Sequence, residues 1–449
     1  MDTPRGGLTV RQAAFIGVGA MVGAGIFSLL GPAGEVAGAA VWLSFLIAGT
    51  IALFQGYSFA KLGSRFPSGS GMIEYLARGF GPGHLTGVSS WLVFASNIIV
   101  TSMVAVSFGS YASSMFTDGD ATWAKVFAVL IVLAMGTLNV VGSGAVAKAQ
   151  GVIVRVVIGI LVIFSVVTLA NVDWSLLAFS GYPSMRQIVS SVALTFFAFL
   201  GFGVITFTAK DLAHPKRELP RAMYIALAIA GIVYVAISLG VYGTLTVDEV
   251  IASGGTALAE AAKPTLGDAG YLLMAITALF ATAGATNSGI YPTAGLSKDL
   301  AAKGQFPPVL GRDWGRMSIA LGFMVVATLM LTVFFDLSAI ASLGSAVALL
   351  IFTLVSIAHL RVRKLTGARI GVLLLALVTT ATTFAVFAST TLADKPATMT
   401  TLVAIIVLAI GLDLTWKWIA HRREGDGGRT EDLIVHADGR QLTGTSSGA

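Results

Sequence analysis

The sequence predicts an all-α integral membrane protein, and three observations support this fold class. Of the 449 residues, 56% are apolar and only 11% are charged, and the mean hydropathy is +0.87. Soluble domains carry about 25% charged residues. Long apolar segments recur along almost the whole chain, and Lys and Arg gather in every second connection between them. These features predict one membrane unit rather than several soluble domains.

Twelve apolar segments are long enough to cross a bilayer, for which a helix needs about 20 residues. The first six lie near residues 12–34, 40–61, 85–115, 123–142, 149–172 and 187–209. The other six lie near residues 220–245, 269–296, 317–335, 338–360, 369–392 and 398–420. We therefore expect twelve transmembrane helices.

The distribution of basic residues predicts how these helices are oriented. If both termini are cytoplasmic, the external connections hold four of the 28 Lys and Arg residues, namely Lys125, Arg186, Lys263 and Lys395. The other 24 then lie at or near the cytoplasmic side, as the positive-inside rule requires. The net charge of +6 is explained by these connections, so we expect no nucleic-acid partner. We expect a multi-pass protein of the plasma membrane with both termini in the cytoplasm.

Several kinds of site are excluded by residue type. The chain has no cysteine, which excludes disulfides, Cys-ligated metals and Cys nucleophiles. Its five histidines are scattered, so no metal-ligand spacing is present. The segments also lack the cluster of His, Asp and Glu that an enzyme embedded in the membrane would need. We expect no cofactor, no metal and no catalytic centre.

The chain divides into two halves followed by an extension. Residues 1–11 form a short cytoplasmic N-terminus, and the apolar segment that follows is expected to be an uncleaved first span. Two five-span halves cover residues 12–172 and 187–360, and two further spans occupy 369–420. The polar, glycine-rich residues 421–449 are expected to be a disordered tail.

The first segment contains the glycine-rich stretch FIGVGAMVGAGIF, which has three interpretations. Its G-x-x-x-G-x-G spacing resembles a nucleotide loop, but no strand precedes it and no acidic residue follows at the ribose position. Gly19 and Gly23 also form the G-x-x-x-G of packed membrane helices. The third interpretation is an interrupted helix, because Gly201-Phe202-Gly203 in the sixth segment matches Gly23-Ala24-Gly25. Matched interruptions in corresponding halves indicate a site at the membrane midplane.

An interrupted helix offers a specific kind of binding site. Glycine costs about 1 kcal/mol relative to alanine inside a helix. Opening the helix frees N–H and C=O groups that lipid cannot satisfy, so these groups must face a cavity. The partly positive start of a half-helix suits a carboxylate, and free carbonyls suit an ammonium or a cation. An α-amino acid presents both charges, and residues 20–27 and 198–205 supply no charged side chain of their own.

Four ordered motifs resemble those of the amino acid–polyamine–organocation (APC) permeases. They are GAMVGAGIF at residues 19–27, FPSGSGMIEYLARGFGP at 66–82, FFAFLGFGVITFTAKDLAHPKRELPRAM at 196–223 and AKGQFP at 302–307. The resemblance covers roughly residues 10–420. It implies a five-plus-five inverted-repeat core with broken first and sixth helices, two additional C-terminal helices and transport by alternating access.

The resemblance also implies a set of substrate-binding residues. The backbone at Gly23, Ala24 and Gly25 would hold a carboxylate, with Ile26 beside it. The ammonium would meet carbonyls near Ala20, Met21, Phe199 and Gly201. Phe197 and Phe199 lie where the family places aromatic side chains over the substrate, and Gly203 and Asn97 complete the expected set.

Three departures from the family pattern leave the coupling ion open between H⁺ and Na⁺. Many relatives carry an acidic residue where this chain has Gly203, and the family's Glu-Glu pair is Lys210-Asp211 here. Some proton-coupled members carry a lysine in the fifth span, at a position that corresponds to Val157. Arg155 lies two residues earlier and on a different helical face. These departures also weaken the case for a cationic substrate.

The remaining polar residues within the spans each have two interpretations. Arg155 is either a built-in cation near the site or a side chain that extends to the lipid headgroups. Asn97, and the group formed by Thr282, Thr286 and Asn287, either line the cavity or hydrogen-bond between helices. Asp413 is expected to pair with Lys417 one turn away.

These observations predict a secondary transporter that moves an amino acid or a related amine, coupled to H⁺ or Na⁺. The nearest alternative is an exchanger or facilitator without ion coupling, because of Gly203 and Val157. An ion channel would need a selectivity filter or rings of charge, and the sequence has neither.

Overall fold

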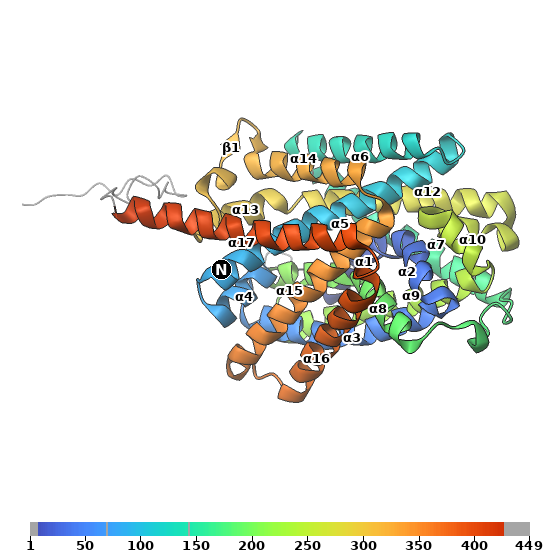
Figure 1. The fold of residues 1–449 in the computed structure, drawn as a ribbon, viewed down its shortest axis with the longest axis horizontal. Coiled ribbons are helices and arrows are strands. Elements are labelled where there is room, and N and C mark those ends of the chain that lie inside the picture. Colours follow the sequence, from blue (N-terminus) through green and yellow to red (C-terminus); the bar gives the residue numbers. More distant parts are fainter. Residues whose placement is uncertain (1–7, 69–70, 142–143, 426–449) are drawn as a thin grey trace, which may run out of the picture.

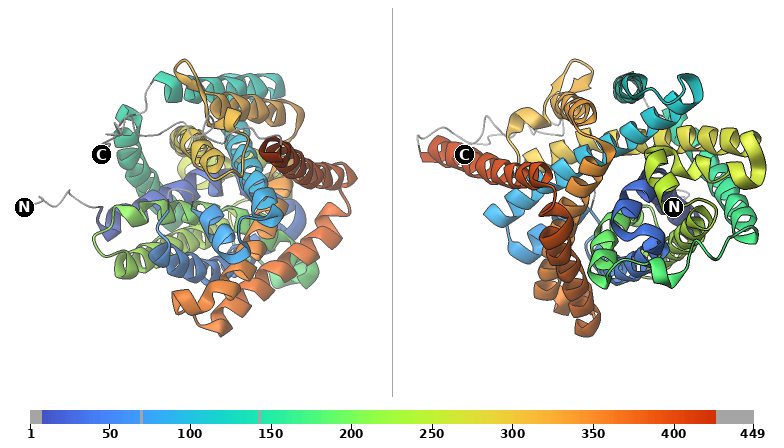
Figure 2. Two further views of the ribbon diagram at one scale, coloured as in Figure 1. Left: turned by 90° about the vertical axis from the view of Figure 1, so that its left-hand side faces the viewer. Right: turned by 45° about the vertical axis from the view of Figure 1, so that its right-hand side comes forward.

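The computed structural model describes residues 8–68, 71–141 and 144–425, and these residues are almost entirely helical. Helices α5, α6, α12 and α17 run along the long axis of the molecule (Figure 1). The two views of Figure 2 show the helices packed side by side as one bundle. Buried apolar side chains from nearly all of the helices form one continuous core.

The described part of the first half contains seven α-helices and two short 3₁₀ segments before the sixth span begins. They are α1 (Val10–Ala24), α2 (Ile26–Ala37), η1 (Gly38–Ala40), α3 (Val41–Arg65), α4 (Met72–Phe80), α5 (His84–Phe116), α6 (Ala121–Val141), α7 (Gly144–Ala170) and η2 (Phe179–Gly181). Helices α1 and α2 together form the first expected span, interrupted at Gly25.

The second half begins with another interrupted span. Its elements are α8 (Met185–Phe197), η3 (Leu200–Lys210), α9 (Pro215–Tyr242), α10 (Val247–Ser253), η4 (Gly254–Thr256), α11 (Ala257–Glu260), α12 (Lys263–Ile290), α13 (Thr293–Ala302) and η5 (Pro308–Gly311). A two-stranded hairpin, β1 (Asp313–Trp314) and β2 (Met317–Ser318), leads into α14 (Ile319–Phe334) and α15 (Leu337–Thr366). Helix α16 (Ile370–Phe387), the π-helical turn η6 (Ala388–Leu392) and α17 (Pro396–Gly425) follow.

Ten helical segments among the described residues are long and apolar enough to cross a membrane. One of them, Ile26–Arg65, includes both α2 and α3. Two shorter apolar helices, Val10–Gly23 and Ile319–Phe334, accompany the ten. The all-helical, membrane-spanning fold class is thereby confirmed, while the count of twelve stays a prediction. Helix α17 continues through residues 421–425, and the rest of the expected tail lies outside the described residues.

Both interrupted spans start in the same way. Thr9 caps α1 and exchanges hydrogen bonds with Gln12, and Ser184 caps α8 and exchanges hydrogen bonds with Gln187. This capping box satisfies amides that the first helical turn leaves unpaired. Each interrupted span therefore has a defined starting residue.

The two ends of the described chain lie at the same end of the bundle, which we call the terminal end. The Leu8 amide donates to the Asp211 carbonyl at 2.9 Å, which joins the start of the chain to the end of η3. The Ser64 hydroxyl donates to the Pro215 carbonyl at 3.1 Å, which joins the end of α3 to the start of α9.

The terminal end also holds α4, α13 and the last turns of α17. Lys303, just after α13, pairs with Glu74 of α4 at 3.0 Å. The Trp416 indole N–H of α17 donates to the Gly304 carbonyl at 3.0 Å. At the opposite end, the Trp42 indole N–H donates to the Tyr182 hydroxyl at 2.7 Å.

Candidate functional site

The first span is interrupted by one residue. Gly25 separates α1 from α2 and has φ −107° and ψ −67°. Its amide donates to the Met21 carbonyl at 3.0 Å, and its carbonyl accepts from the amides of Ser28 and Leu29 at 3.1 Å. The interruption is therefore confined to a single residue rather than a long unwound stretch.

The sixth span is interrupted two residues earlier than its glycines. Helix α8 ends at Phe197, and Ala198 and Phe199 form a turn with amide bonds to carbonyls three residues before them, at 3.1 and 2.9 Å. The eleven residues of η3 then continue as a 3₁₀-helix that contains Gly201 and Gly203. A 3₁₀-helix rarely exceeds about four residues, and a long one within a span often marks a hinge.

The two interruptions contact each other through glycine. A Cβ atom added to Gly25 would lie 2.6 Å from the Ala198 Cα atom. A Cβ atom added to Gly201 would lie 2.7 Å from the Ala20 carbonyl oxygen. Real Cβ atoms essentially never approach this closely, so each position requires glycine for backbone contact with the other span. We call this reciprocal contact the glycine crossing, formed by Gly25 on Ala198 and Gly201 on Ala20.

The other glycines of the two spans have different surroundings. A Cβ atom on Gly19 would overlap the Val154 side chain of α7, and one on Gly23 would lie 2.8 Å from the Ala281 carbonyl oxygen of α12. These two glycines therefore pack the first span against the fifth and eighth, as the G-x-x-x-G interpretation predicts. Gly203 has room, because an added Cβ would approach no atom closer than 4.0 Å.

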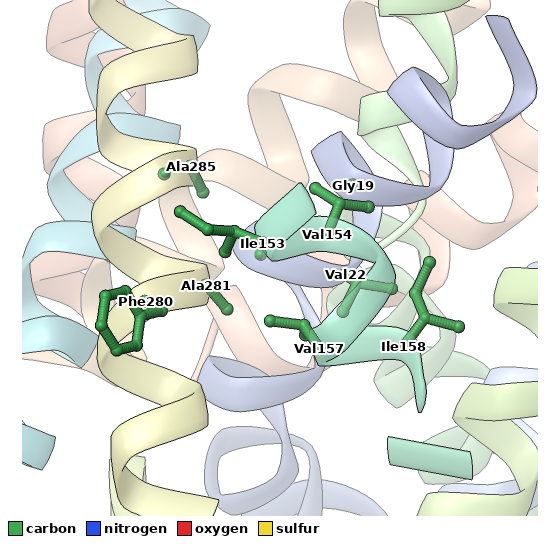
Figure 3. Close-up of a pocket in the computed structure, with 11 residues that line it drawn as sticks. Gly19, Val22, Ile153, Val154, Val157, Ile158, Phe280, Ala281 and Ala285 are labelled. Atoms are coloured by element: carbon green, nitrogen blue, oxygen red, sulfur yellow. The ribbon is translucent and has the colours of Figure 1, made fainter. Parts of the chain in front are cut away.

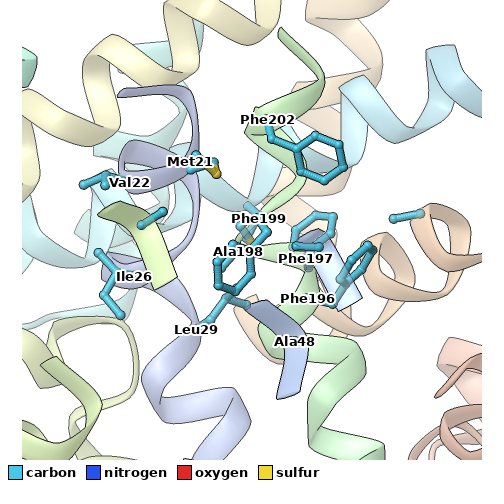
Figure 4. Close-up of a cluster of buried hydrophobic side chains, with 14 of the residues drawn as sticks. Met21, Val22, Ile26, Leu29, Ala48, Phe196, Phe197, Ala198, Phe199 and Phe202 are labelled. Carbon is cyan, nitrogen blue, oxygen red and sulfur yellow. The ribbon is translucent and has the colours of Figure 1, made fainter. Parts of the chain in front are cut away.

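The phenylalanines of the sixth span point in different directions. Figure 4 shows Phe196, Phe197, Phe199 and Phe202 beside the buried side chains of the first span. The Phe199 ring packs edge-on against Tyr234 of α9, with 5.0 Å between ring centroids. The Phe197 ring instead lies against Gly344 of α15, where an added Cβ would come within 2.6 Å of Phe197 Cε2. Of the two predicted aromatic residues, Phe197 is the one directed toward the tenth span.

Tyr234 hydrogen-bonds to the backbone at the interruption of the sixth span, and the sequence analysis did not identify it. Its hydroxyl donates to the Ala198 carbonyl at 3.2 Å, and the residue is fully buried. The turn at Ala198 leaves this carbonyl outside the α-helical ladder, so it requires another donor. The available signal was weak: a tyrosine in an apolar span needs a hydrogen-bond partner, but its position does not reveal which one, and the same span also contains Tyr224 and Tyr242.

A small apolar pocket adjoins the glycine crossing, between α1, α7 and α12 (Figure 3). Every side chain that lines it is apolar. The lining residues are Gly19, Val22, Gly23, Ile153, Val154, Val157, Ile158, Phe280, Ala281, Gly284 and Ala285. A hard cation such as Na⁺ prefers oxygen ligands, and here only main-chain carbonyls could provide them.

Arg155 lies apart from this pocket. Its side chain is exposed, and its Nε donates to the Gly151 carbonyl one turn earlier at 2.8 Å. Val157 lines the pocket instead. The two residues lie on different faces of α7, and the arginine faces away from the glycine crossing.

The polar residues of the eighth span have partners within the bundle. The Thr282 and Thr286 hydroxyls donate to the carbonyls of Ala278 and Thr282, at 2.7 and 2.9 Å. The Asn287 side-chain oxygen accepts from the Asn139 amide of α6 at 2.8 Å.

Asn97 occupies a separate position, half-buried in α5, where its carbonyl accepts the Thr101 hydroxyl at 2.7 Å. The hydrogen bonds of Thr282, Thr286 and Asn287 fit the interpretation in which polar side chains bond within and between helices.

A cluster of charged side chains lies at the terminal end. Glu74 pairs with Arg78 at 2.7 Å and with Lys303 at 3.0 Å. Burial opposes ionisation of Glu74, but the hydrogen bonds from Arg78 and Lys303 outweigh burial and hold the pKa of its carboxyl below the usual value. Asp299 gives Lys303 a second carboxylate at 3.0 Å. This cluster joins α4 to α13 through charge.

Within 8–68, 71–141 and 144–425, no group of three or more His, Asp or Glu residues is arranged to hold a metal ion. His359 of α15 is buried, with its ring nitrogens bonded to Ser58 at 2.6 Å and Thr366 at 2.9 Å. The Thr366 hydroxyl donates to the Arg363 carbonyl, so it accepts from His359 Nε2. This histidine joins helices and has no free nitrogen for a ligand.

Comparison with known proteins agrees with this architecture. Residues 8–412 match the family described as amino acid permease. The inner membrane transport protein YbaT of Escherichia coli is 30% identical over 351 residues, which are 78% of this chain and 82% of that protein. An uncharacterized protein of Methanocaldococcus jannaschii is 32% identical over 355 residues, with the same shares. The vacuolar cationic amino acid transporter 2 of Arabidopsis thaliana is 27% identical over 386 residues, 79% of this chain and 59% of that protein.

The apolar helical bundle and the paired interruptions define an integral membrane transporter. The chain belongs to the amino acid permeases of the APC superfamily, which are transporters and not enzymes. The resemblance expected from the four motifs is confirmed.

Proposed function

We propose that the protein is a secondary transporter that moves a neutral amino acid across the plasma membrane by alternating access. The substrate binds beside the glycine crossing, on the side of α5 and α15. The observation that carries this proposal is the reciprocal contact of Gly25 with Ala198 and Gly201 with Ala20. Two interrupted spans that meet through backbone place helix ends and main-chain groups at one point inside the bundle.

The charges of an α-amino acid suit this point. The α2 helix starts after Gly25, so its first amides offer partial positive charge to a carboxylate. The carbonyls near Ala20, Met21, Phe199 and Gly201 are proposed to accept the ammonium. Gly23, Ala24 and Ile26 flank the carboxylate in this arrangement, and Gly203 lies further along η3.

The proposed substrate side chain is apolar. No charged residue occurs in segments 12–34 or 187–209, so a charged substrate side chain would have no partner on either interrupted span. Phe197, Ile99 and Gly344 are in close contact where the sixth, third and tenth spans meet. An apolar substrate side chain that entered here would exchange apolar contacts between these residues for apolar contacts with the substrate. Asn97, two residues before Ile99, is proposed to supply a polar group.

Two transport modes are candidates. The first is transport coupled to H⁺ or Na⁺. The second is exchange without a coupling ion, and the apolar lining of the pocket that includes Val157 favours it. Only for ion-coupled transport do we propose a cavity or coupling role for four further residues, namely Thr282, Thr286, Asn287 and Arg155. The hydrogen bonds of the first three and the exposure of Arg155 favour structural roles instead.

The proposed architecture has twelve spans in two inverted five-span halves, with both termini cytoplasmic. Two contacts between elements support the halves: the first span packs on the sixth through α1 and η3, and the second on the seventh through α3 and α9. The proximity of Leu8 and Trp416 to one end of the bundle supports an even number of spans.

Uptake into proteoliposomes tests the function. Purified protein is reconstituted and offered labelled amino acids and amines under a Na⁺ gradient, under a proton gradient, or with unlabelled substrate trapped inside. We expect apolar neutral amino acids to enter and to exchange with trapped substrate. Absence of both uptake and exchange for every amino acid and amine, in vesicles with folded and inserted protein, would contradict the proposal.

Glycine variants test the site. Gly25→Ala and Gly201→Ala each add a Cβ atom at the crossing, and both are expected to reduce the initial rate of uptake at least about tenfold. Gly159→Ala in α7 is the matched control, since no atom lies within 4 Å of its added Cβ, and it should retain most of the rate. The larger side chain of Gly25→Leu would separate the two spans altogether, so this variant would not distinguish loss of the site from loss of packing. Equal loss in all three variants would place the site elsewhere.

A further inference from the structure

A groove rich in basic and aromatic side chains lies at the terminal end, away from the glycine crossing. His84, the first residue of α5, forms one wall, and α17 forms the other. The α17 residues that line the groove are Leu414, Thr415, Lys417, Trp418 and His421. We call this the α5–α17 groove. We propose that it binds the headgroup of an anionic phospholipid, with the acyl chains lying along α17.

A buried carboxylate organises the groove. The Asp413 side chain is completely buried, with His84 Nδ1 at 2.7 Å and Lys417 Nζ at 3.0 Å. Gly87 makes room for it, since an added Cβ would lie 2.7 Å from the Asp413 Cγ atom. Asp413 thus fixes one histidine and one lysine at the rim of the groove, at the point where α5 and α17 pack together.

The histidines are oriented with one nitrogen available. His84 Nδ1 bonds to the Asp413 carboxylate, and His421 Nδ1 bonds to the Lys417 carbonyl at 3.0 Å. Both acceptors require that Nδ1 carries the proton, so Nε2 is left for an outside partner in each ring. Both histidines are exposed.

Arg422 adds a permanent charge. Its guanidinium carbon lies 3.9 Å from the centre of the Trp418 ring, a cation–π contact. The arginine is exposed, and so is Trp418. A tryptophan that is half in contact with protein and half exposed is typical of the level of lipid headgroups. Among the described side chains around the groove, Lys417 and Arg422 carry two positive charges against the single carboxylate of Asp413, which favours an anionic ligand.

An exposed apolar stripe on α17 leads into the groove. It contains Val403, Val407 and Leu414, whose exposed fractions are 50%, 61% and 50%. Their spacing continues to Trp418 and His421, so all five residues lie on one helical face. From Val403 to Leu414 a helix rises about 16 Å, close to half of the roughly 30 Å hydrocarbon core. The stripe therefore has the length of one leaflet, with the basic groove at its headgroup end.

Lipid titration of the full-length protein in detergent tests the proposal. The probes are phosphatidylglycerol, phosphatidylcholine with the same acyl chains, and glycerol 3-phosphate as a headgroup without chains. Bound lipid is counted by native mass spectrometry. We expect tighter binding of phosphatidylglycerol than of phosphatidylcholine, and weak binding of glycerol 3-phosphate. Equal binding of the two lipids, or equally tight binding of glycerol 3-phosphate, would overturn the proposal.

Variants locate the binding. His421→Gln combined with Arg422→Gln should weaken phosphatidylglycerol binding at least about fivefold and leave phosphatidylcholine unchanged. Lys364→Gln combined with Arg369→Gln removes two exposed basic residues elsewhere and should leave both lipids unchanged. Lys417 is retained because Asp413 would otherwise lose a partner. A loss as large in the control as in the groove variant would overturn the assignment.

The chain's own acidic residues after Gly425 are the competing occupant. Residues 426–449 include Asp426, Glu431 and Asp432. If phosphatidylglycerol bound only after these residues were removed, the groove would belong to that segment and the proposal would fail. Equal binding with and without them would support the lipid.

Discussion

At the scale of single residues, the glycines of the first span differ by what they face. Gly19 and Gly23 contact α7 and α12, whereas Gly25 contacts the backbone of the sixth span. The glycines of one sequence motif therefore have two roles: some allow helices to pack closely, and one allows the backbones of two spans to cross. The distinction depends on the neighbour of each glycine, which the spacing within the motif does not specify.

Tyr234 provides a test at this scale. Removal of its hydroxyl by Tyr234→Phe leaves the buried Ala198 carbonyl without this donor. A net hydrogen bond contributes about 1 kcal/mol, so thermal unfolding in detergent should shift down by about 1 °C in a chain of this length. Uptake should also fall, because the turn at Ala198 loses a support.

Tyr224→Phe in the same helix is the control for Tyr234. Tyr224 is partly exposed and should tolerate the change. If Tyr234→Phe unfolds at the same temperature as the unchanged protein, the hydroxyl has no supporting role at the break.

At the scale of elements, hydropathy predicted the all-helical membrane fold, because a bilayer selects apolar segments of fixed length whatever their partners. The break in the sixth span was less predictable. Sequence reasoning placed it at Gly201 and Gly203, but the turn occurs at Ala198 and Phe199. Alanine and phenylalanine carry no local signal for a turn, and the position depends on where the first span crosses. The orientation of Phe199 toward Tyr234 has the same tertiary origin.

The ion pairs between α4 and α13 give a prediction that depends on pH. The lowered pKa of Glu74 means that its charge stabilises the fold above its unfolded pKa of about 4.5, and that this contribution is lost as pH falls through the lower folded value. Glu74→Gln should therefore unfold a few degrees lower at pH 7. The difference from the unchanged protein should shrink between about pH 5 and pH 3.

Asp248→Asn, an exposed acidic residue in α10, serves as the control for Glu74. It should unfold like the unchanged protein across this pH range. A difference for Glu74→Gln that stayed constant with pH would show that its charge does not stabilise the contact between α4 and α13.

At the scale of the whole molecule, both ends of the bundle are held by an ion pair and a tryptophan hydrogen bond. The terminal end has Lys303 with Glu74 and Trp416 with Gly304, and the opposite end has Lys395 with Glu35 and Trp42 with Tyr182. The chain alternates between these ends along its length (Figure 1). This alternation makes the proposed orientation testable without any knowledge of the substrate.

The absence of cysteine allows single-site labelling. Arg316→Cys lies in the hairpin at the terminal end, and Trp174→Cys lies in the exposed connection after α7. In intact cells a membrane-impermeant maleimide should label Trp174→Cys, and it should label Arg316→Cys only after the membrane is opened. Labelling of both positions from outside would contradict the proposed orientation.

The long 3₁₀-helix of η3 has a mechanical consequence. A 3₁₀-helix rises about 2.0 Å per residue and an α-helix about 1.5 Å. Rewinding the eleven residues of η3 as α-helix would shorten the segment by about 5 Å, nearly one helical turn. The end of η3 is tied to the start of the chain through Asp211 and Leu8. A change of winding beside Ala198 would therefore displace Asp211, and with it Leu8, which immediately precedes the first span.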